Sequence, residues 1–193
     1  MINSRKELKK YLAIEAAKLN IHHFWLQWLS GSEFACIYNY MWVLRHLEYF
    51  MSKSQSSKIF TPPHLIFLLW HRKLRIKYGI HLGPGVAAEG FHIVHLGFLR
   101  CYGIAQIGRN CTVLPMVLFG KKRPGIGEGR LITVGDNCYF GTGCTVLAPC
   151  HIGNNVTVAA GAVVTMEEIP DNVVVAGVPA RIVKRKKRNC PAR

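Results

Sequence analysis

The most regular pattern in the chain is a six-residue repeat of apolar and small positions between Val134 and Val164. In each six, the first position holds a bulky apolar residue and the fifth holds a small one. The first positions are Val134, Phe140, Val146, Ile152, Val158 and Val164, and the fifth are Cys138, Cys144, Cys150, Val156 and Ala162. A period of six matches neither an α-helix nor the alternation of a half-buried strand. It is typical of a hexapeptide β-helix, in which each six makes one short strand and one corner.

Side-chain size explains the two apolar positions of the repeat. The bulky residue points into a narrow three-sided prism, and the small one fills the space where a larger side chain would clash. We expect the corners to use backbone angles that glycine and asparagine adopt at low cost. The corner residues of this kind are Gly135, Asn137, Gly153, Asn154 and Asn155. Three sixes make one coil, and the coils stack by strand pairing.

The repeat is interrupted at one place and fades at both ends. Ile107, Val113 and Phe119 continue the sixes upstream, and 80–100 is predicted as an irregular first part of the coil. Val134 follows Phe119 by fifteen positions, which is two and a half sixes, so a loop within 120–133 must leave the prism. Long loops on rigid scaffolds usually carry function. The coil is predicted to end at 167–172, followed by a final extended turn over 173–182.

The segment before the repeat, 1–78, reads as helical rather than β. Ser4 and Glu7 form the pattern of a capping box, and apolar residues follow at helical spacing from Lys6. A second helical region is expected over 22–51, with a break at Gly31. A Ser- and Lys-rich stretch over 52–63 is predicted as a linker, and a third helix over 64–78 should end at Gly79.

These patterns divide the chain into an N-terminal helical region (1–78), a β-helix (79–184) and a basic tail (185–193). The fold class is therefore mainly β, a parallel β-helix with an N-terminal α-helical region and a C-terminal extension. The helical histidines lack a carboxylate or cysteine at ligand spacing, so they are interpreted as surface or packing residues. They are His22, His23, His46, His64 and His71.

Composition narrows the class of protein. No apolar run approaches the roughly 18 residues of a membrane span, and the first residues lack the apolar core of a signal peptide. We therefore expect a cytoplasmic protein. The seven cysteines form no C-x-x-C pair, and those at fifth positions are interpreted as core residues. Neither a disulfide framework nor a metal site is expected.

The chain carries a formal net charge of +15. Lysine and arginine cluster at 72–77, 121–123 and 184–188. A basic surface implies an anionic partner, such as a phosphorylated cofactor, an acidic glycan or a membrane surface. The residues from 186 onward are interpreted as a solvated tail. No nucleic-acid fold signature accompanies the charge, so nucleic acid is not expected.

Three stretches carry a resemblance to a known family. They are Ile93-Val94-His95-Leu96-Gly97 with Ile107-Gly108-Arg109-Asn110, the run Ile152-Gly153-Asn154-Asn155-Val156, and the ending Val175-Ala176-Gly177-Val178-Pro179-Ala180-Arg181-Ile182-Val183. Over residues 79–184 the chain resembles the hexapeptide-repeat acyltransferases, in particular the serine acetyltransferase-like branch. The helical region resembles the leader of the serine acetyltransferase-like proteins of polysaccharide gene clusters.

The resemblance implies a left-handed β-helix, a homotrimer or a dimer of trimers, and active sites in the grooves between neighbouring prisms. It implies acetyl-CoA as the acyl donor and His95 as the general base that activates an acceptor hydroxyl. An imidazole with a pKa near 6.5 can take a proton from an alcohol, which is a weak nucleophile at neutral pH. His92 is the competing candidate for this role.

The resemblance also implies which residues meet acetyl-CoA. Small residues at repeat turns let the pantetheine arm approach the backbone, and basic residues near the C-terminus meet the adenosine phosphates. The turn positions are Gly141, Thr142, Ala160 and Gly161, and the basic residues are Arg181, Lys184 and Arg185.

The sequence departs from serine acetyltransferases on the acceptor side. Val94 stands where the family has an Asp before the catalytic His, and Ile80 where it has a second Asp. In the loop Arg130 matches the family Arg, but Leu131 replaces its His. A free amino acid needs a carboxylate for its ammonium group, and Glu89 or Glu128 would have to supply it. We therefore expect a saccharide hydroxyl as acceptor, with Lys121, Arg130 and Glu89 as candidate substrate contacts.

Two alternatives stay open at this stage. One is a serine O-acetyltransferase, which predicts a carboxylate near His95 in the folded protein. The other is a non-catalytic β-helix that binds an acidic partner, in which case neither thioester cleavage nor a functional role for His95 is expected.

Overall fold

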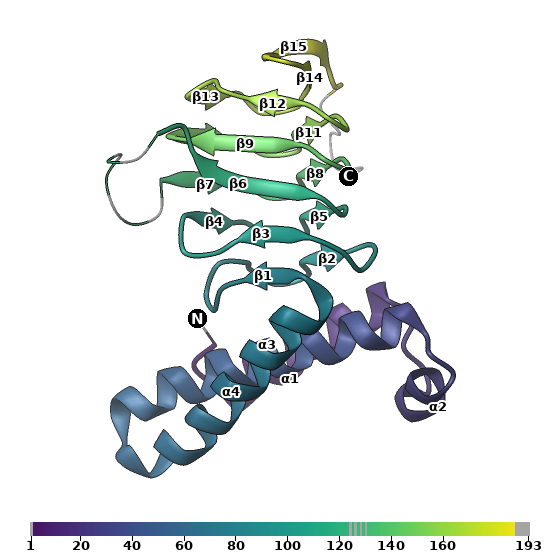
Figure 1. Cartoon of the computed structure of the whole chain (residues 1–193), viewed down its shortest axis with the longest axis vertical. Helices are drawn as coiled ribbons and strands as arrows, with labels where there is room; N and C mark the ends of the chain where they lie inside the picture. The colour runs from purple at the N-terminus through teal and green to yellow at the C-terminus, as the bar shows by residue number, and fades with distance from the viewer. Residues whose placement is uncertain (1, 124, 126, 128, 130, 188–193) are drawn as a thin grey trace, which may run out of the picture.

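The computed structural model describes residues 2–187 apart from 124, 126, 128 and 130, and it places a layer of helices across one end of a stack of strands (Figure 1). The helices are α1 (Arg5–Lys18), α2 (Phe24–Leu29), α3 (Glu33–Ser56) and α4 (Thr61–Tyr78), with a 3-10 turn η1 (Lys58–Phe60). Among the described residues, no helix has the length and apolar character that crossing a bilayer would require.

The strands form three sheets that are parallel except for the last strand. Sheet A contains β1 (Ile80–Leu82), β3 (Leu99–Cys101), β6 (Val117–Lys121), β9 (Thr145–Ala148) and β12 (Val163–Val164). Sheet B contains β4 (Ala105–Ile107), β7 (Ile132–Val134), β10 (Cys150–Ile152) and β13 (Glu168–Ile169). Sheet C contains β2 (His92–Ile93), β5 (Thr112–Val113), β8 (Tyr139–Phe140), β11 (Thr157–Val158), β14 (Val173–Gly177) and the antiparallel β15 (Ala180–Arg185).

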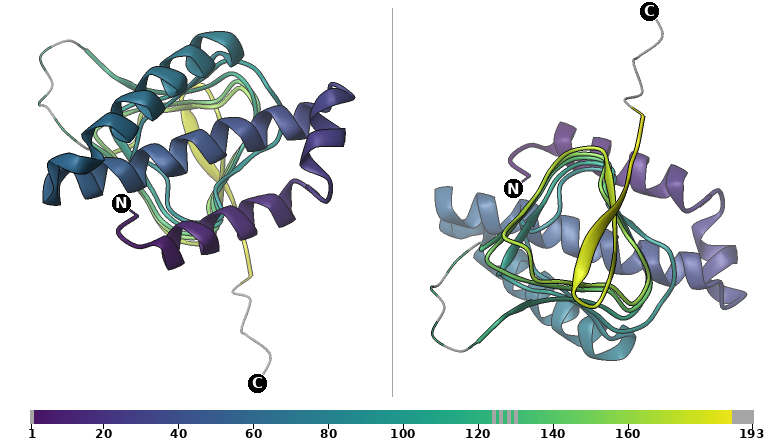
Figure 2. Two further views of the ribbon diagram at one scale, coloured as in Figure 1. Left: turned by 90° about the horizontal axis from the view of Figure 1, so that it is seen from below. Right: turned by 90° about the horizontal axis from the view of Figure 1, so that it is seen from above.

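Up to β14, strands that follow one another in the chain belong to different sheets, which makes a three-sided coil. Figure 2 shows the coils superposed as a three-sided outline, with the helices crossing one end. Ile132 pairs with Cys150 and Thr145 with Val163, so in each pair the partner lies three sixes further along the chain. The predicted arrangement of mainly parallel strands behind N-terminal helices is confirmed.

The loop predicted between Phe119 and Val134 is present between β6 and β7 (Figure 1). Leu118 pairs with Thr145, 27 residues further along the chain, whereas partners in the coils that do not span this loop are 17 to 20 residues apart. The additional residues leave the stack without disturbing the pairing of the coils above and below.

The inward positions of the repeat are filled as the sequence predicts. All first-position residues from Val134 to Val164 are buried, and so are the fifth-position cysteines Cys138, Cys144 and Cys150. These cysteines are free thiols in the prism interior. The core continues into the helices through Tyr40 and Leu44, so coil and helices share one apolar interior.

Backbone angles explain only some of the glycines and asparagines at the corners. Asn137 and Asn155 adopt positive φ values of 58° and 54°, as expected of corner residues, but Gly135, Gly153 and Asn154 do not. A Cβ on Gly135 would lie 2.8 Å from the carbonyl carbon of Gly153 in the next coil. These glycines are required because stacked coils approach closely, not because of their own backbone angles.

Two boundary predictions are wrong. The stretch 52–63 is not a linker, since α3 runs to Ser56, η1 follows, and α4 already begins at Thr61 with prolines in its first turn. Proline is tolerated there because the first turn needs no backbone donor. The coil also does not end at 167–172, because β13 pairs with β10 and β14 pairs with β11. The capping box at Ser4 and the left-handed Gly79 are confirmed.

A buried ion cluster joins the helices to the first coil. Arg45 is fully buried and pairs with Glu15 at 2.6 Å and with Glu48 at 3.0 Å. Its guanidinium also donates to the carbonyl oxygens of Ala87 and Ala88 at 2.9 and 3.1 Å. One side chain therefore connects α1, α3 and the coil.

Among the helical histidines that the structure describes, only His71 is fully buried. Its burial leads us to expect that the fold loses stability in acid. His71 shares a hydrogen bond of 3.1 Å with the Tyr40 hydroxyl, which donates to the Ile80 carbonyl at 3.0 Å. Burial, and then the charge of Arg75, lowers the pKa of His71 from 6.5 to about 4. Below pH 6.5 the unfolded chain therefore takes up a proton that the folded chain refuses.

We expect the free energy of unfolding to fall by about 3 kcal/mol as the pH drops from about 6.5 to about 4, through this residue alone. Urea unfolding at several pH values measures the slope. Because other groups also titrate, the test is the difference from His71→Gln, whose stability should change less steeply in this range. Equal slopes in the two proteins would contradict the assignment.

Candidate active site

The candidate base His95 lies at a corner of the prism, two residues after the end of β2. The backbone N–H of Val94 donates to the Val113 carbonyl of the next coil, which fixes the chain at this point. Gly97 follows with a φ of 140° and turns the chain toward sheet A. The His95 side chain is 54% exposed. The corner thus presents an imidazole to solvent from a rigid backbone.

A carboxylate from the helical layer holds this imidazole. Glu33 is the first residue of α3, where a negative charge is favoured by the helix dipole. Its Oε2 lies 3.2 Å from His95 Nδ1, and its Oε1 accepts a hydrogen bond of 2.5 Å from the Leu96 N–H. Burial raises the pKa of Glu33, but the Leu96 N–H and His95 lower it more, so the pKa is lowered overall. The carboxylate therefore stays ionised at neutral pH.

The contact decides which ring nitrogen of His95 can act as a base. An ionised carboxylate only accepts hydrogen bonds, so Nδ1 of His95 must carry the proton that it donates to Glu33. The lone pair of the neutral imidazole then lies on Nε2. A histidine oriented in this way is equipped to take a proton from a hydroxyl group.

The turn residues predicted to meet acetyl-CoA lie along the same edge of the prism as His95. The corner after β8 holds Gly141 and Thr142, and the corner after β11 holds Ala160 and Gly161. The two corners stack directly, since the Gly161 N–H donates to the Thr142 carbonyl at 2.9 Å. β2, β5, β8 and β11 are successive neighbours in sheet C. With about 4.8 Å per coil, His95 and Ala160 are separated by roughly 15 Å of this edge.

Small side chains keep this edge open. Gly141 is packed so closely that a Cβ there would lie 2.5 Å from the Ala160 nitrogen. Thr142, Ala160 and Gly161 are exposed. The edge therefore offers accessible backbone groups and little side-chain bulk over two consecutive coils.

The three basic residues predicted to meet phosphates do not lie together. Arg181 pairs with Ala176 near the end of β14, where the chain reaches the same edge as His95. Lys184 and Arg185 pair with Val174 and Val173 at the start of β14, toward the neighbouring edge. All three are exposed at the end of the stack opposite the helices (Figure 1).

The residues predicted to contact the acceptor are not found together beside His95. Glu89 does not supply a carboxylate to His95, because Lys10 of α1 holds it in an ion pair of 2.7 Å. Lys121 lies at the end of β6 and donates to the Gly127 carbonyl within the loop at 2.8 Å. Arg130 and Glu128 lie outside the described residues.

His92, the competing candidate base, is half-buried on β2. Burial, and then the charge of Lys18, lowers the pKa of His92. His95 is therefore the better placed of the two. Within the described part of the chain, no cluster of three or more His, Cys, Asp or Glu side chains could hold a metal ion.

Sequence reasoning missed Glu33. The sequence offered one signal for a special role of this residue. Glu33 directly follows the Gly31-Ser32 helix break and so stands at the start of a predicted helix. Its position 62 residues from His95 gives no local pattern that would join the two. Only the docking of the helical layer against the first coils brings them into contact.

Comparisons with known proteins agree with this geometry. Residues 132–165 match the bacterial transferase hexapeptide family (six repeats). A serine acetyltransferase of Mycobacterium tuberculosis (strain ATCC 25618 / H37Rv) is 33% identical over 110 residues, which cover 56% of this chain and 47% of that protein. A galactoside O-acetyltransferase of Escherichia coli (strain K12) is 42% identical over 53 residues, which cover 28% of this chain and 26% of that protein.

A solved structure extends the likeness to the helical layer. The serine acetyltransferase of Brucella abortus strain S19, in complex with coenzyme A, superposes with a TM-score of 0.61 at 16% identity, covering 95% of this chain and 70% of that one. This likeness shows the fold. The resemblance to hexapeptide-repeat acyltransferases of the serine acetyltransferase-like branch is confirmed. The chain spans less than half the length of the first curated relatives it matches.

Proposed function

We propose that the protein is an acetyl-CoA-dependent O-acetyltransferase that acts on a hydroxyl group of a saccharide in capsule, exopolysaccharide or lipopolysaccharide synthesis. The observation that carries the proposal is the Glu33–His95 pair at the head of an edge lined by small corner residues. The chain is similar to a serine acetyltransferase and to a galactoside O-acetyltransferase. This similarity supports acetyl transfer as the reaction class.

His95 is the base in this proposal. Its Nε2 takes the proton of the acceptor hydroxyl while the hydroxyl oxygen attacks the thioester carbon of acetyl-CoA. The protonated imidazole then returns that proton to the departing thiolate, so the products are an acetyl ester and free coenzyme A. Glu33 holds Nδ1–H throughout and stabilises the imidazolium that forms between the two steps.

The corner edge is the proposed binding surface for the acetyl-CoA arm. Gly141, Thr142, Ala160 and Gly161 would let the arm lie against backbone groups, and Arg181 stands at the same edge to meet a phosphate. Lys184 and Arg185 would meet phosphates only from the neighbouring edge. The proposal also includes a left-handed coil, a homotrimer with sites between neighbouring prisms, and a cytoplasmic location.

Serine is the second candidate acceptor, and a specific observation favours it. A carboxylate lies near His95, as the serine alternative predicts. However, both oxygens of Glu33 already have donors, one from Leu96 and one from His95. An ammonium group would compete with those donors, so we place the saccharide first.

The test is acetyl-CoA turnover, followed as free thiol release, against serine and a panel of sugars and oligosaccharides. Turnover that requires a saccharide is the expected result. Turnover with serine alone would overturn the acceptor assignment but keep the reaction class. A protein that neither releases thiol nor binds coenzyme A in calorimetry would overturn the enzyme proposal and favour a non-catalytic β-helix with an acidic partner.

A further inference from the structure

Two helices of the N-terminal layer expose large apolar side chains that no described element covers. Leu29 of α2 is 74% exposed and Ile76 of α4 is 82% exposed. The exposed apolar residues of α2 and α4 are Trp25, Leu26, Trp28, Leu29, Leu65, Ile66, Leu69, Trp70 and Ile76. We call this set the apolar helix face. Clusters of this kind mark interaction sites rather than ordinary solvent-exposed surface.

The apolar residues of α4 share their side of the helix with cations. Leu65, Leu69 and Ile76 recur at intervals of four and seven, which places them on one side of an α-helix. Arg72 and Lys73 are exposed on the same side, and Lys77 is exposed one residue after Ile76. Neither α2 nor α4 contains an acidic residue. An ordinary solvent-facing helix carries charges of both signs, whereas an apolar face with cations alone is typical of helices that lie at a membrane surface.

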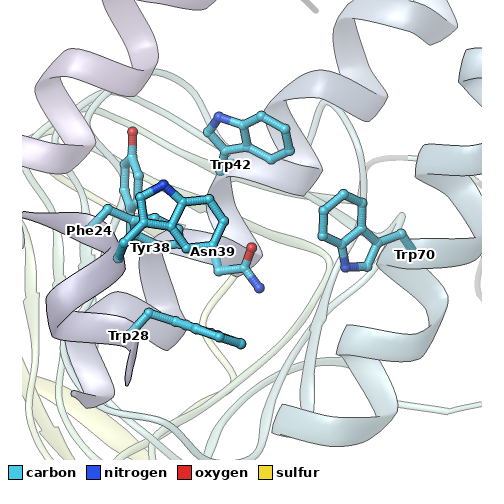
Figure 3. A pocket seen from close by; sticks show the side chains of 7 residues that line it. Phe24, Trp28, Tyr38, Asn39, Trp42 and Trp70 are labelled. Carbon is cyan, nitrogen blue, oxygen red and sulfur yellow. The ribbon is translucent and has the colours of Figure 1, made fainter. Parts of the chain in front are cut away.

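An aromatic pocket of about 500 Å³ is lined by residues of α2, α3 and α4. Figure 3 shows the indole rings of Trp28, Trp42 and Trp70 grouped around the Asn39 side chain. Phe24, Trp25 and Tyr38 complete the lining. All four tryptophans of the chain therefore lie around this pocket. Tryptophan is the residue that favours the headgroup region of a bilayer, because its ring is apolar and its N–H is polar.

We propose that the apolar helix face docks on the surface of an anionic lipid bilayer. The tryptophans and leucines enter the headgroup region, while Arg72, Lys73 and Lys77 pair with anionic headgroups. The net charge of +15 attracts the protein to such a surface over a longer range. A second copy of the chain fits this face less well, because two acid-free basic faces would repel each other.

The α2 part of the apolar helix face is linked to the candidate site by a short connection in the chain. Leu29, the last residue of α2, is close in the chain to Glu33, which contacts His95. Resting on the proposed function, the inference is that docking brings the His95 corner to an acceptor saccharide carried at the membrane surface. The docking itself does not depend on catalysis and is measured without acetyl-CoA.

The experiment is sedimentation of the full chain with two kinds of vesicle, one made of one part phosphatidylglycerol to two parts phosphatidylcholine and one of phosphatidylcholine alone. We expect binding to the anionic vesicles at least tenfold tighter than to the neutral ones. Since all four tryptophans line the pocket, their fluorescence should shift to shorter wavelength on binding. Leu26→Gln/Leu29→Gln and Ile66→Gln/Leu69→Gln should each weaken binding at least tenfold. Both change exposed side chains, and circular dichroism checks that they fold.

Matched controls change the opposite end of the molecule. Val183→Gln removes a similarly exposed apolar side chain from β15, and Lys184→Gln/Arg185→Gln removes two charges there. Both should bind anionic vesicles within about twofold of the wild type. Loss of binding in the charge control with retention in the apolar variants would mean attraction by the basic C-terminal end and would overturn the proposal. Absence of vesicle binding, with self-association that the Ile66→Gln/Leu69→Gln variant abolishes, would also overturn it and assign the face to a second copy.

Discussion

Replacing His95 with alanine is expected to lower the rate of thiol release from acetyl-CoA by about 10²- to 10⁴-fold, the contribution usual for a general base. The loss should fall on kcat, because the side chain acts on the acceptor proton rather than on the coenzyme. Affinity for coenzyme A, measured by calorimetry, should stay within about threefold. The imidazole is 54% exposed, so the melting temperature should change little.

The Glu33 variants test whether the helical layer positions the base. Glu33→Gln keeps the shape of the side chain but replaces an ionised acceptor by a neutral amide, so kcat should fall by a smaller factor than in His95→Ala. Glu33→Asp keeps the charge on a shorter side chain and should recover part of the activity. His95→Ala/Glu33→Gln should be no slower than His95→Ala alone, because Glu33 acts through His95. Full activity in His95→Ala would contradict the assignment and return attention to His92.

Replacing Arg45 with alanine is expected to have the largest effect on stability, about 3–5 kcal/mol in the free energy of unfolding. The substitution leaves Glu15 and Glu48 buried without their cation and removes the donors to the Ala87 and Ala88 carbonyls. For a domain with an ordinary stability of about 5–15 kcal/mol, this is a large fraction of the total. Urea unfolding, followed by tryptophan fluorescence, measures it.

The matched control is Lys10→Ala, which breaks another ion pair between the helices and the first coil. Lys10 is 59% exposed, and its pair with Glu89 is therefore screened by water. Its loss should cost at most about 1 kcal/mol. Equal effects from the two variants would show that the buried cluster does not hold the helical layer to the coil.

The six-residue period by itself determined most of the coil. A bulky residue at each first position and a small one at each fifth can be buried together only in a narrow three-sided prism, and Phe140, Cys144 and Val146 lie in its interior. The same period located the loop, because the spacing of fifteen positions from Phe119 to Val134 is not a whole number of sixes. Local signals at Ser4 and Gly79 were also sufficient, since capping involves only neighbouring residues.

Contacts between distant segments were decided by the tertiary structure alone. The period does not show why position 135 must be glycine. The reason is that the backbone of Gly153 in the next coil lies too close to allow a Cβ there. Nor does it say that the coil continues through β13 and β14, where the repeat is irregular but the pairing persists. Arg45 and Glu15 are 30 residues apart, and Glu33 and His95 are 62 apart. The six-residue pattern, read from Ile93 as a first position, indicates that His95 stands at a corner, because such a pattern is local. The edge on which it stands follows from the pairing of β2 with β5, and its partner depends on how the helices dock, which no local pattern specifies.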